Sequence, residues 1–218
     1  MIKNRKVRAM QKLLIINNEK DRDDIGWIPQ IKKAVSAVEN VEFAVIHHSE
    51  ASKDTLDDIN PDLIYLTGRA TYDWTIDEIL KDYTSIINML QYTEIPTLGV
   101  CAGHELMAIA YGGSFGKMIE TEKGKEDVRE KGFHKIDVTK ETPLFKGLGS
   151  HFHCYQDHRD EVKNVPDTFE LLASNDMCKI QSIKHREKEF YGVQFHPEQY
   201  TEDYPDGKII LQNFLTLK

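Results

Sequence analysis

The chain has 218 residues, and its 28 lysines and arginines against 36 aspartates and glutamates give a net charge of −8. With 40% hydrophobic and 29% charged residues, it has the composition of an ordinary globular protein with enough length for a full core. The acidic balance argues against binding nucleic acid by phosphate neutralisation, and no apolar run approaches the roughly 18 residues of a membrane-spanning helix. The three cysteines, Cys101, Cys154 and Cys178, form no CxxC pair or disulfide framework, so we expect a cytoplasmic protein.

The N-terminal segment, residues 1–11, is basic and contains no acidic residue. A signal peptide needs an apolar stretch of about seven residues after its basic region, and the apolar run that begins at Leu13 is shorter than that. An organellar presequence is the alternative, but the segment lacks serines. We therefore interpret residues 1–11 as a flexible basic leader and residues 12–218 as a single domain.

Short apolar runs alternate with helix-period segments in the first half of the chain. This alternation is typical of parallel strands joined by crossover helices. The sequence therefore predicts an α/β fold whose open, mostly parallel sheet is flanked by helices. We expect strands at residues 13–16, 41–46, 63–66 and 97–100, and helices at residues 28–38, 76–90 and 104–111.

The second half changes character, because strand-like segments follow one another with few helices between them. This pattern predicts an antiparallel extension of the same domain. The expected elements are strands at residues 117–121, 135–138, 169–173, 179–184 and 189–195, followed by a closing helix at residues 208–217.

The segment GVCAGHE, residues 99–105, places a cysteine where a buried strand turns abruptly into a helix. A nucleophile on such a turn has strained backbone angles, and small residues are required at Gly99 and Gly103 because larger ones would collide with the adjoining strand and helix. The helix N-terminus favours thiolate over thiol at Cys101, and the N–H of Ala102 is placed to bind a developing oxyanion. The alternative is a buried cysteine that only packs.

The segment YGVQFHPE, residues 191–198, places His196 at the end of a strand and Glu198 two residues later, across a proline. A cysteine nucleophile needs an imidazole to take up and return a proton, and the imidazole needs a carboxylate to fix its tautomer. Taken alone, a His-Pro-Glu turn is also compatible with a surface turn. Together with Cys101, it supplies the parts of a catalytic triad.

The motifs GVCAGHEL and YGVQFHPE resemble those of the class I glutamine amidotransferases, which use a Cys-His-Glu triad. The resemblance covers most of the chain from about Lys12 onward. It implies a flavodoxin-like fold and hydrolysis of L-glutamine to glutamate and ammonia through a γ-glutamyl thioester. It also implies Cys101 as nucleophile, His196 as general base and acid, and Glu198 as the residue that orients His196.

The stretch from Asp160 to Glu198 is most similar to the free-standing glutaminase subunit of archaeal-type GMP synthases. That similarity implies that ammonia passes to a synthetase partner, namely an ATP pyrophosphatase subunit that aminates XMP. ATP and Mg²⁺ are then expected only on the partner. We expect no cofactor and no metal in this chain.

Several residues depart from the pattern of this family. The family usually has a Gly-Gly-Pro turn whose second glycine offers an oxyanion-hole N–H, and here Gly68 is followed by Arg69. A backbone N–H survives this change, but a positive φ would be costly for arginine. Glu105 stands where the family commonly has a glutamine that helps to hold the substrate. Asp157 replaces the serine of a Trp-x-Ser-His-x-Asp stretch in which His158 is kept.

These departures leave two further functions open. With Glu105 and Asp157 altering the pocket, the chain could hydrolyse another γ-glutamyl compound, or it could be a non-catalytic regulatory or scaffold protein that retained the fold. Ligand types for zinc also occur together at His151, His153 and Cys154, but their spacing matches no common zinc module.

Overall fold

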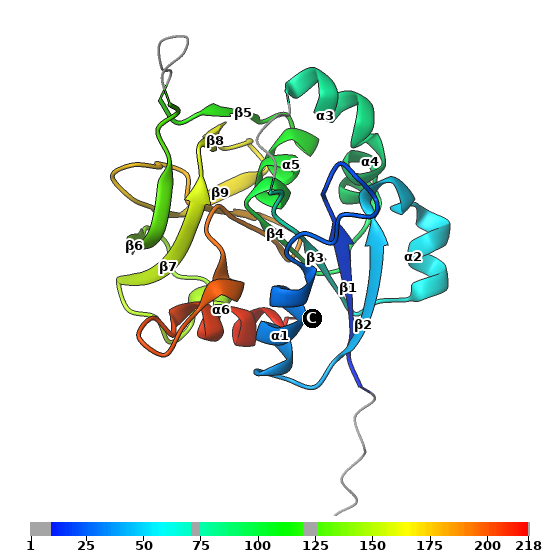
Figure 1. Ribbon diagram of the computed structural model, residues 1–218, viewed down its shortest axis with the longest axis horizontal. Helices are drawn as coiled ribbons and strands as arrows, with labels where there is room; N and C mark the ends of the chain where they lie inside the picture. The colour runs from blue at the N-terminus through cyan, green and yellow to red at the C-terminus, as the bar shows by residue number, and fades with distance from the viewer. Residues whose placement is uncertain (1–9, 71–74, 120–125, 218) are drawn as a thin grey trace, which may run out of the picture.

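Figure 1 shows a computed structural model of the protein, which describes residues 10–70, 75–119 and 126–217. One nine-stranded sheet runs through both halves of the chain, in the order β2-β1-β3-β4-β11-β10-β9-β6-β7. The first five of these strands pair in parallel, which confirms the expected mostly parallel sheet. Their bounds are β1 (Lys12–Asn17), β2 (Glu42–His47), β3 (Leu63–Leu66), β4 (Thr97–Val100) and β11 (Phe190–Val193).

Helices cover both faces of the parallel strands, and strand residues alternate between the two cores. Leu13 and Ile15 of β1 pack in one core with residues of α1 and α6, whereas Leu14 and Ile16 pack in the other core with residues of α2, α3, α4 and α5. Figure 1 shows α1 beside α6, and α3, α4 and α5 grouped apart from them. The bounds are α1 (Ile28–Ser36), α2 (Lys53–Ile59), α3 (Ile76–Asp82), α4 (Thr84–Tyr92), α5 (Ala102–Ala110) and α6 (Asp206–Phe214).

The remaining four strands of the sheet are antiparallel, as predicted for the second half. A separate two-stranded antiparallel sheet is formed by β5 and β8. The antiparallel extension therefore continues the same sheet beyond β11. The bounds are β5 (Ser114–Lys117), β6 (Glu130–Val138), β7 (His151–His158), β8 (Asp160–Asn164), β9 (Phe169–Ser174) and β10 (Ser182–His185).

Several elements differ from the sequence prediction. The strands β7 and β8 were not expected. In β7, two of the four inward-facing residues are the polar Gln156 and His158, which hide the alternation of a half-buried strand. The helix α2 was not expected either. The single helix predicted at residues 76–90 is two helices, since Tyr83 leaves helical geometry with φ −108° and ψ 18°.

The expected strand at residues 117–121 is displaced toward the N-terminus, because β5 ends at Lys117. Residues 120 and 121 lie outside the described part of the chain, as do residues 1–9 of the expected leader. Among the residues that the structure describes, no helix combines the length and the apolar character needed to cross a bilayer.

Candidate active site

Cys101 occupies a sharp bend between β4 and α5, at the carboxyl end of the parallel strands. Its backbone angles are φ 51° and ψ −106°, a left-handed conformation that is rare for a residue with a side chain. The N–H of Cys101 donates to the carbonyl oxygen of Val193 at 2.8 Å, so the bend is tied directly to β11. The strained backbone predicted for a nucleophile on such a turn is confirmed.

The two glycines that flank Cys101 are required by close backbone packing. A Cβ at Gly99 would lie 2.5 Å from the carbonyl oxygen of Gly103, and a Cβ at Gly103 would lie 2.7 Å from the carbonyl oxygen of Leu66. Both contacts are to backbone atoms, which cannot move aside as a flexible side chain could. The bend therefore depends on glycine on each side, as the sequence indicated.

His196 follows β11 and is joined to Glu198 by a short hydrogen bond. The Nδ1 atom of His196 lies 2.7 Å from Oε1 of Glu198, and the N–H of His196 donates to the carbonyl oxygen of Tyr155 at 2.8 Å. The hydroxyl of Tyr65, on β3, donates to Oε2 of Glu198 at 2.9 Å. The side chains of Tyr65, His196 and Glu198 are buried, so the imidazole orientation is fixed by a carboxylate that is itself held on its far side.

Sequence reasoning missed Tyr65, which reads as one more residue of an apolar strand. Its hydroxyl is the only polar side-chain group in the segment LIYL, and a buried tyrosine hydroxyl usually has a partner. That signal points to a hydrogen bond, but it does not identify Glu198 as the acceptor.

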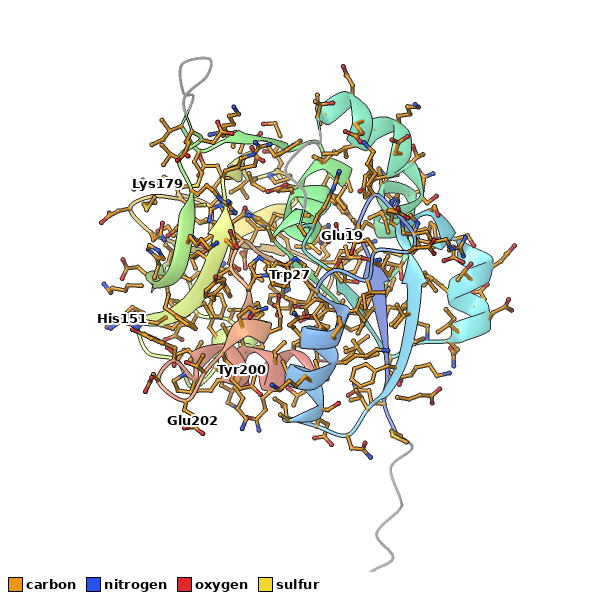
Figure 2. The ribbon with its side chains drawn as sticks, in the orientation of Figure 1. Glu19, Trp27, His151, Lys179, Tyr200 and Glu202 are labelled. Atoms are coloured by element: carbon orange, nitrogen blue, oxygen red, sulfur yellow. The ribbon has the colours of Figure 1, made fainter. Side chains whose placement is uncertain are left out.

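Gly68 shows that Cys101 and His196 converge on one point. A Cβ at Gly68 would lie 2.9 Å from Cε1 of His196 and 3.5 Å from Cβ of Cys101. The ring of Trp27 packs against the imidazole with centroids 5.0 Å apart. Figure 2 shows Trp27 toward the middle of the molecule. The structure thus brings Cys101, His196 and Glu198 together, with Gly68 at the same place.

The environment of Cys101 favours the neutral thiol. Burial raises the pKa of Cys101 well above its ordinary value, and the negative charges of Glu105, Glu198 and Asp157 raise it further. The Ala102 N–H acts in the opposite direction, because a hydrogen bond to sulfur favours the thiolate. The predicted thiolate-favouring contact is present, but burial and nearby carboxylates outweigh it.

Glu105 is a buried carboxyl group close to Cys101. Burial raises the pKa of Glu105 to about 8, and the charge of Asp160 adds to this, while Gln194 and Arg69 act in the opposite direction. The Nε2 atom of Gln194 lies 3.5 Å from Oε1 of Glu105 and 3.7 Å from Sγ of Cys101. Gln194 was not singled out from the sequence, although it lies within the YGVQFHPE motif.

Asp157 and His158 lie at the end of β7, beside the strand residue that binds His196. Asp157 forms an ion pair with Arg129. The His158 ring is turned into the interior, with Nε2 3.1 Å from Oε2 of the fully buried Glu130 and Nδ1 2.8 Å from the carbonyl oxygen of Asp160. The imidazole of His158 is thus engaged within the protein, and this side chain is occupied with holding β6 against β7.

Arg69 does not adopt the strained backbone that the family turn would require of it. Asn60 and Cys101 are the non-glycine residues with positive φ in the described part of the chain. The guanidinium of Arg69 is buried, and its Nη1 atom lies 3.4 Å from the hydroxyl of Tyr83. The backbone N–H at position 69 is retained without a conformational cost of the kind expected for a positive φ.

The zinc alternative finds no support in the geometry. Among the described residues, no group of three or more histidine, cysteine or acidic side chains is placed to hold a metal ion. Cys154 is buried in the core, whereas His151 is exposed and lies at the margin of the molecule in Figure 2.

A strained cysteine bend beside a histidine–glutamate pair, at the carboxyl edge of an α/β sheet, places the structure in the class of α/β proteins with a cysteine elbow, an arrangement suited to acyl chemistry. Comparison with known proteins narrows this class. The chain belongs to the class-I glutamine amidotransferase family, whose profile matches residues 24–217.

Several relatives are components of GMP synthases. The A subunit of the glutamine-hydrolyzing GMP synthase of Methanococcus maripaludis is 47% identical over 131 residues, which are 60% of this chain and 64% of the relative. The protein of the same name from Methanosphaera stadtmanae is 35% identical over 176 residues, covering 80% and 84% of the two chains. The match thus spans less than two thirds of the Methanococcus maripaludis relative but most of the Methanosphaera stadtmanae one.

A solved structure has the same fold over nearly the whole chain. It is a Thermoplasma acidophilum protein described as a candidate A subunit of GMP synthase, with a TM-score of 0.76 and 28% identity, covering 94% of this chain and 92% of that one. A glutamine amidotransferase from Thermotoga maritima, at a TM-score of 0.64 and 19% identity, shares the fold over 87% of this chain and 77% of that one. Both confirm the fold predicted from the sequence.

The packing around the bend predicts a large cost for Gly103→Ala. Because the new Cβ would meet the Leu66 carbonyl, we expect a loss of about 1–3 kcal/mol in the free energy of unfolding, as for other overpacked cores. Urea unfolding of wild type and variant measures this difference in the free energy of unfolding. Gly149→Ala is the control, since a Cβ there meets nothing within 4 Å and should change stability by less than about 0.5 kcal/mol. Equal stability of the two variants would contradict the packing argument.

Because the pKa of Glu105 is raised, we expect the substitution Glu105→Gln to increase the free energy of unfolding by an amount that depends on pH. The folded protein holds an extra proton between the ordinary pKa of 4.5 and the raised pKa of about 8, so the stability of the wild type falls as pH rises through this window. The variant lacks this titration, and its advantage should grow by up to about 1.4 kcal/mol per pH unit before levelling off above pH 8.

Urea unfolding of both proteins at pH 5.5, 6.5, 7.5 and 8.5 measures the effect of Glu105. The Glu187→Gln variant, at an exposed glutamate, is a matched control for the loss of one carboxylate. Stability profiles of wild type and Glu105→Gln that run parallel across the four pH values would contradict the assignment of a shifted carboxyl group to this site.

Proposed function

We propose that this chain is the glutaminase of a two-chain synthetase, hydrolysing L-glutamine and passing ammonia to a separate ATP-dependent subunit that aminates XMP in GMP synthesis. The observation that carries the proposal is the convergence of Cys101 and the His196–Glu198 pair at Gly68. The relatives are named as one subunit of an enzyme, which supports the existence of a separate partner chain. The three cysteines are free and buried, which suits a reducing cytoplasm.

The proposed reaction begins with proton transfer from the Cys101 thiol to the free nitrogen of His196. The sulfur attacks the side-chain amide carbon of glutamine, and the developing oxyanion accepts hydrogen bonds from the N–H groups of Ala102 and Arg69. His196 then returns the proton to the departing nitrogen, and ammonia leaves as the γ-glutamyl thioester forms.

Water completes the cycle. His196 takes a proton from a water molecule as its oxygen attacks the thioester carbon, and the carbon–sulfur bond breaks to release glutamate. The proton returns to the sulfur, so the site ends as it began. Glu198, held by Tyr65, keeps the imidazole in the required tautomer and offsets its positive charge. ATP and Mg²⁺ are proposed to act only on the partner.

A second candidate substrate class follows from Glu105. A carboxyl group beside the nucleophile, where an amide is common in the family, would change how the amino-acid end of a substrate is held. Hydrolysis of γ-glutamyl amines or peptides is therefore the alternative. Comparing glutamine with these compounds, with and without the XMP-aminating subunit, separates the two: glutamine hydrolysis stimulated by that subunit supports our proposal, and faster turnover of γ-glutamyl amines contradicts it.

Replacement of the nucleophile should abolish covalent chemistry. We expect Cys101→Ala to lose glutamine hydrolysis by at least about 10³-fold and to lose labelling by an electrophilic glutamine analogue, followed by intact mass spectrometry. Cys178→Ala, at another buried cysteine, should keep both activity and labelling. Labelling of Cys101→Ala equal to that of the wild type would refute the assigned nucleophile, whereas a wild type that is neither labelled nor active would favour a scaffold role.

Tyr65→Phe tests the support of Glu198. Removing one hydrogen bond to a buried carboxylate costs about 1.5–3 kcal/mol, so we expect kcat for glutamine to fall about 10- to 100-fold with little change in KM. Tyr191→Phe is the matched control, because Tyr191 also donates to a glutamate, Glu189 at 2.9 Å, away from Cys101. Equal kcat values for the two variants would show that Tyr65 has no part in catalysis.

A further inference from the structure

The loop that carries the proposed oxyanion donor is held by two consecutive residues after β1, Asn18 and Glu19. The N–H of Asn18 donates to the Thr67 hydroxyl at 3.0 Å, and its side-chain amide donates to the Thr67 carbonyl at 2.7 Å. Three residues after Thr67, the N–H of Ala70 donates to Oε1 of Glu19 at 2.9 Å. The peptide between Gly68 and Arg69 is thus fixed on both of its sides.

Glu19 is an unusual residue for this position because its carboxylate is almost completely buried, with 1% of its surface exposed. Oε2 has no hydrogen-bond partner, and burial raises the pKa of Glu19, whereas the Ala70 N–H and the charge of Arg69 lower it. A buried carboxylate with one backbone partner is costly. A carboxyl group at this position therefore lowers stability rather than adding to it.

The surrounding chain is shaped to accept this carboxylate. Gly26 has φ 41°, and a Cβ there would lie 2.5 Å from Oε1 of Glu19. The backbone of Glu19 is also tied down, since Nε2 of His47 lies 2.9 Å from its carbonyl oxygen. Glu19 therefore has little freedom to leave Ala70.

The side chain of Arg69 lies near the residues that hold the loop. Tyr83 contacts Nη1 of Arg69 at 3.4 Å and donates its hydroxyl to the carbonyl oxygen of Asn18 at 2.8 Å. His48 stacks on Tyr83 with ring centroids 4.0 Å apart, and burial lowers the pKa of His48 to about 3, so the ring stays neutral beside the guanidinium. The guanidinium of Arg69 is thereby held beside Tyr83, next to the residues that fix the loop.

We propose that Glu19 is a positioning residue for amide hydrolysis, which holds the Ala70 N–H and thereby orients the neighbouring Arg69 N–H toward the carbonyl oxygen of the substrate. This inference rests on the proposed glutaminase function. It assigns to Glu19 an indirect role, in which Glu19 positions the oxyanion donor through the loop. Glu19 itself does not touch the substrate. Because a preorganised donor acts mainly on the transition state, its loss affects kcat more than KM.

The test compares Glu19→Ala with Glu19→Gln. The alanine variant should lower kcat for glutamine about 10- to 100-fold with KM within about threefold of wild type, and Glu19→Gln, which keeps an acceptor oxygen for Ala70, should recover kcat to within about fivefold. Asp23→Ala, at an exposed acidic residue of the same loop, is the matched control and should stay within about twofold.

A second measurement does not depend on turnover. Amide hydrogen exchange at Arg69 and Ala70, followed by NMR, should be at least about tenfold faster in Glu19→Ala than in wild type, and close to wild type in Glu19→Gln and Asp23→Ala. An active wild type with an equally active Glu19→Ala variant would overturn the positioning role, as would unchanged exchange at both amides. Absence of glutamine hydrolysis by the wild type, with and without the synthetase partner, would instead overturn the proposed function, and exchange would still decide whether Glu19 holds the loop.

Discussion

The whole site depends on how closely α5 approaches β4 around Cys101. A Cβ at Gly99 would collide with the backbone of Gly103, and a Cβ at Gly103 would collide with the end of β3, so the bend at Cys101 tolerates no side chain at either position. The same bend sends the Cys101 N–H to Val193, which places the end of β11 beside the sulfur. The histidine arrives three residues later, because β11 runs parallel to β4 and ends at the same edge.

The electrostatics of the site favour a particular order of proton movement. Burial and the charges of nearby carboxylates raise the pKa of Cys101 and favour its neutral thiol. In the proposed reaction, transfer of the thiol proton to His196 would place a positive ring between the new thiolate and Glu198, where it offsets both negative charges. In that proposal, charge separation becomes favourable as the substrate reacts, and the Ala102 N–H, which bonds the sulfur before reaction, then turns to the oxyanion.

The sequence was most informative where a signal is local. Parallel strands show as continuous apolar runs, and the Gly-x-Cys-x-Gly and His-Pro-Glu segments each carry their geometry within a few residues. The structural features that the sequence did not reveal depend on contacts between residues far apart in the chain. Tyr65 meets Glu198 across 133 positions, and β7 buries the polar His158 because Glu130 lies opposite it on β6. A polar residue facing inward reads as loop until its partner is known.

The two departures nearest the proposed oxyanion site, Arg69 and Glu105, are linked by charge. The charge of Arg69 lowers the pKa of Glu105, after the effects of Gln194 and Arg159, and partly opposes the effect of burial. Arg69 also keeps a negative φ and directs its side chain to Tyr83. In the proposed function, an arginine at this position adds a positive charge near the site while its backbone N–H is still present as a donor. Because the positive charge is buried, its effect on Glu105 is weakly screened by salt.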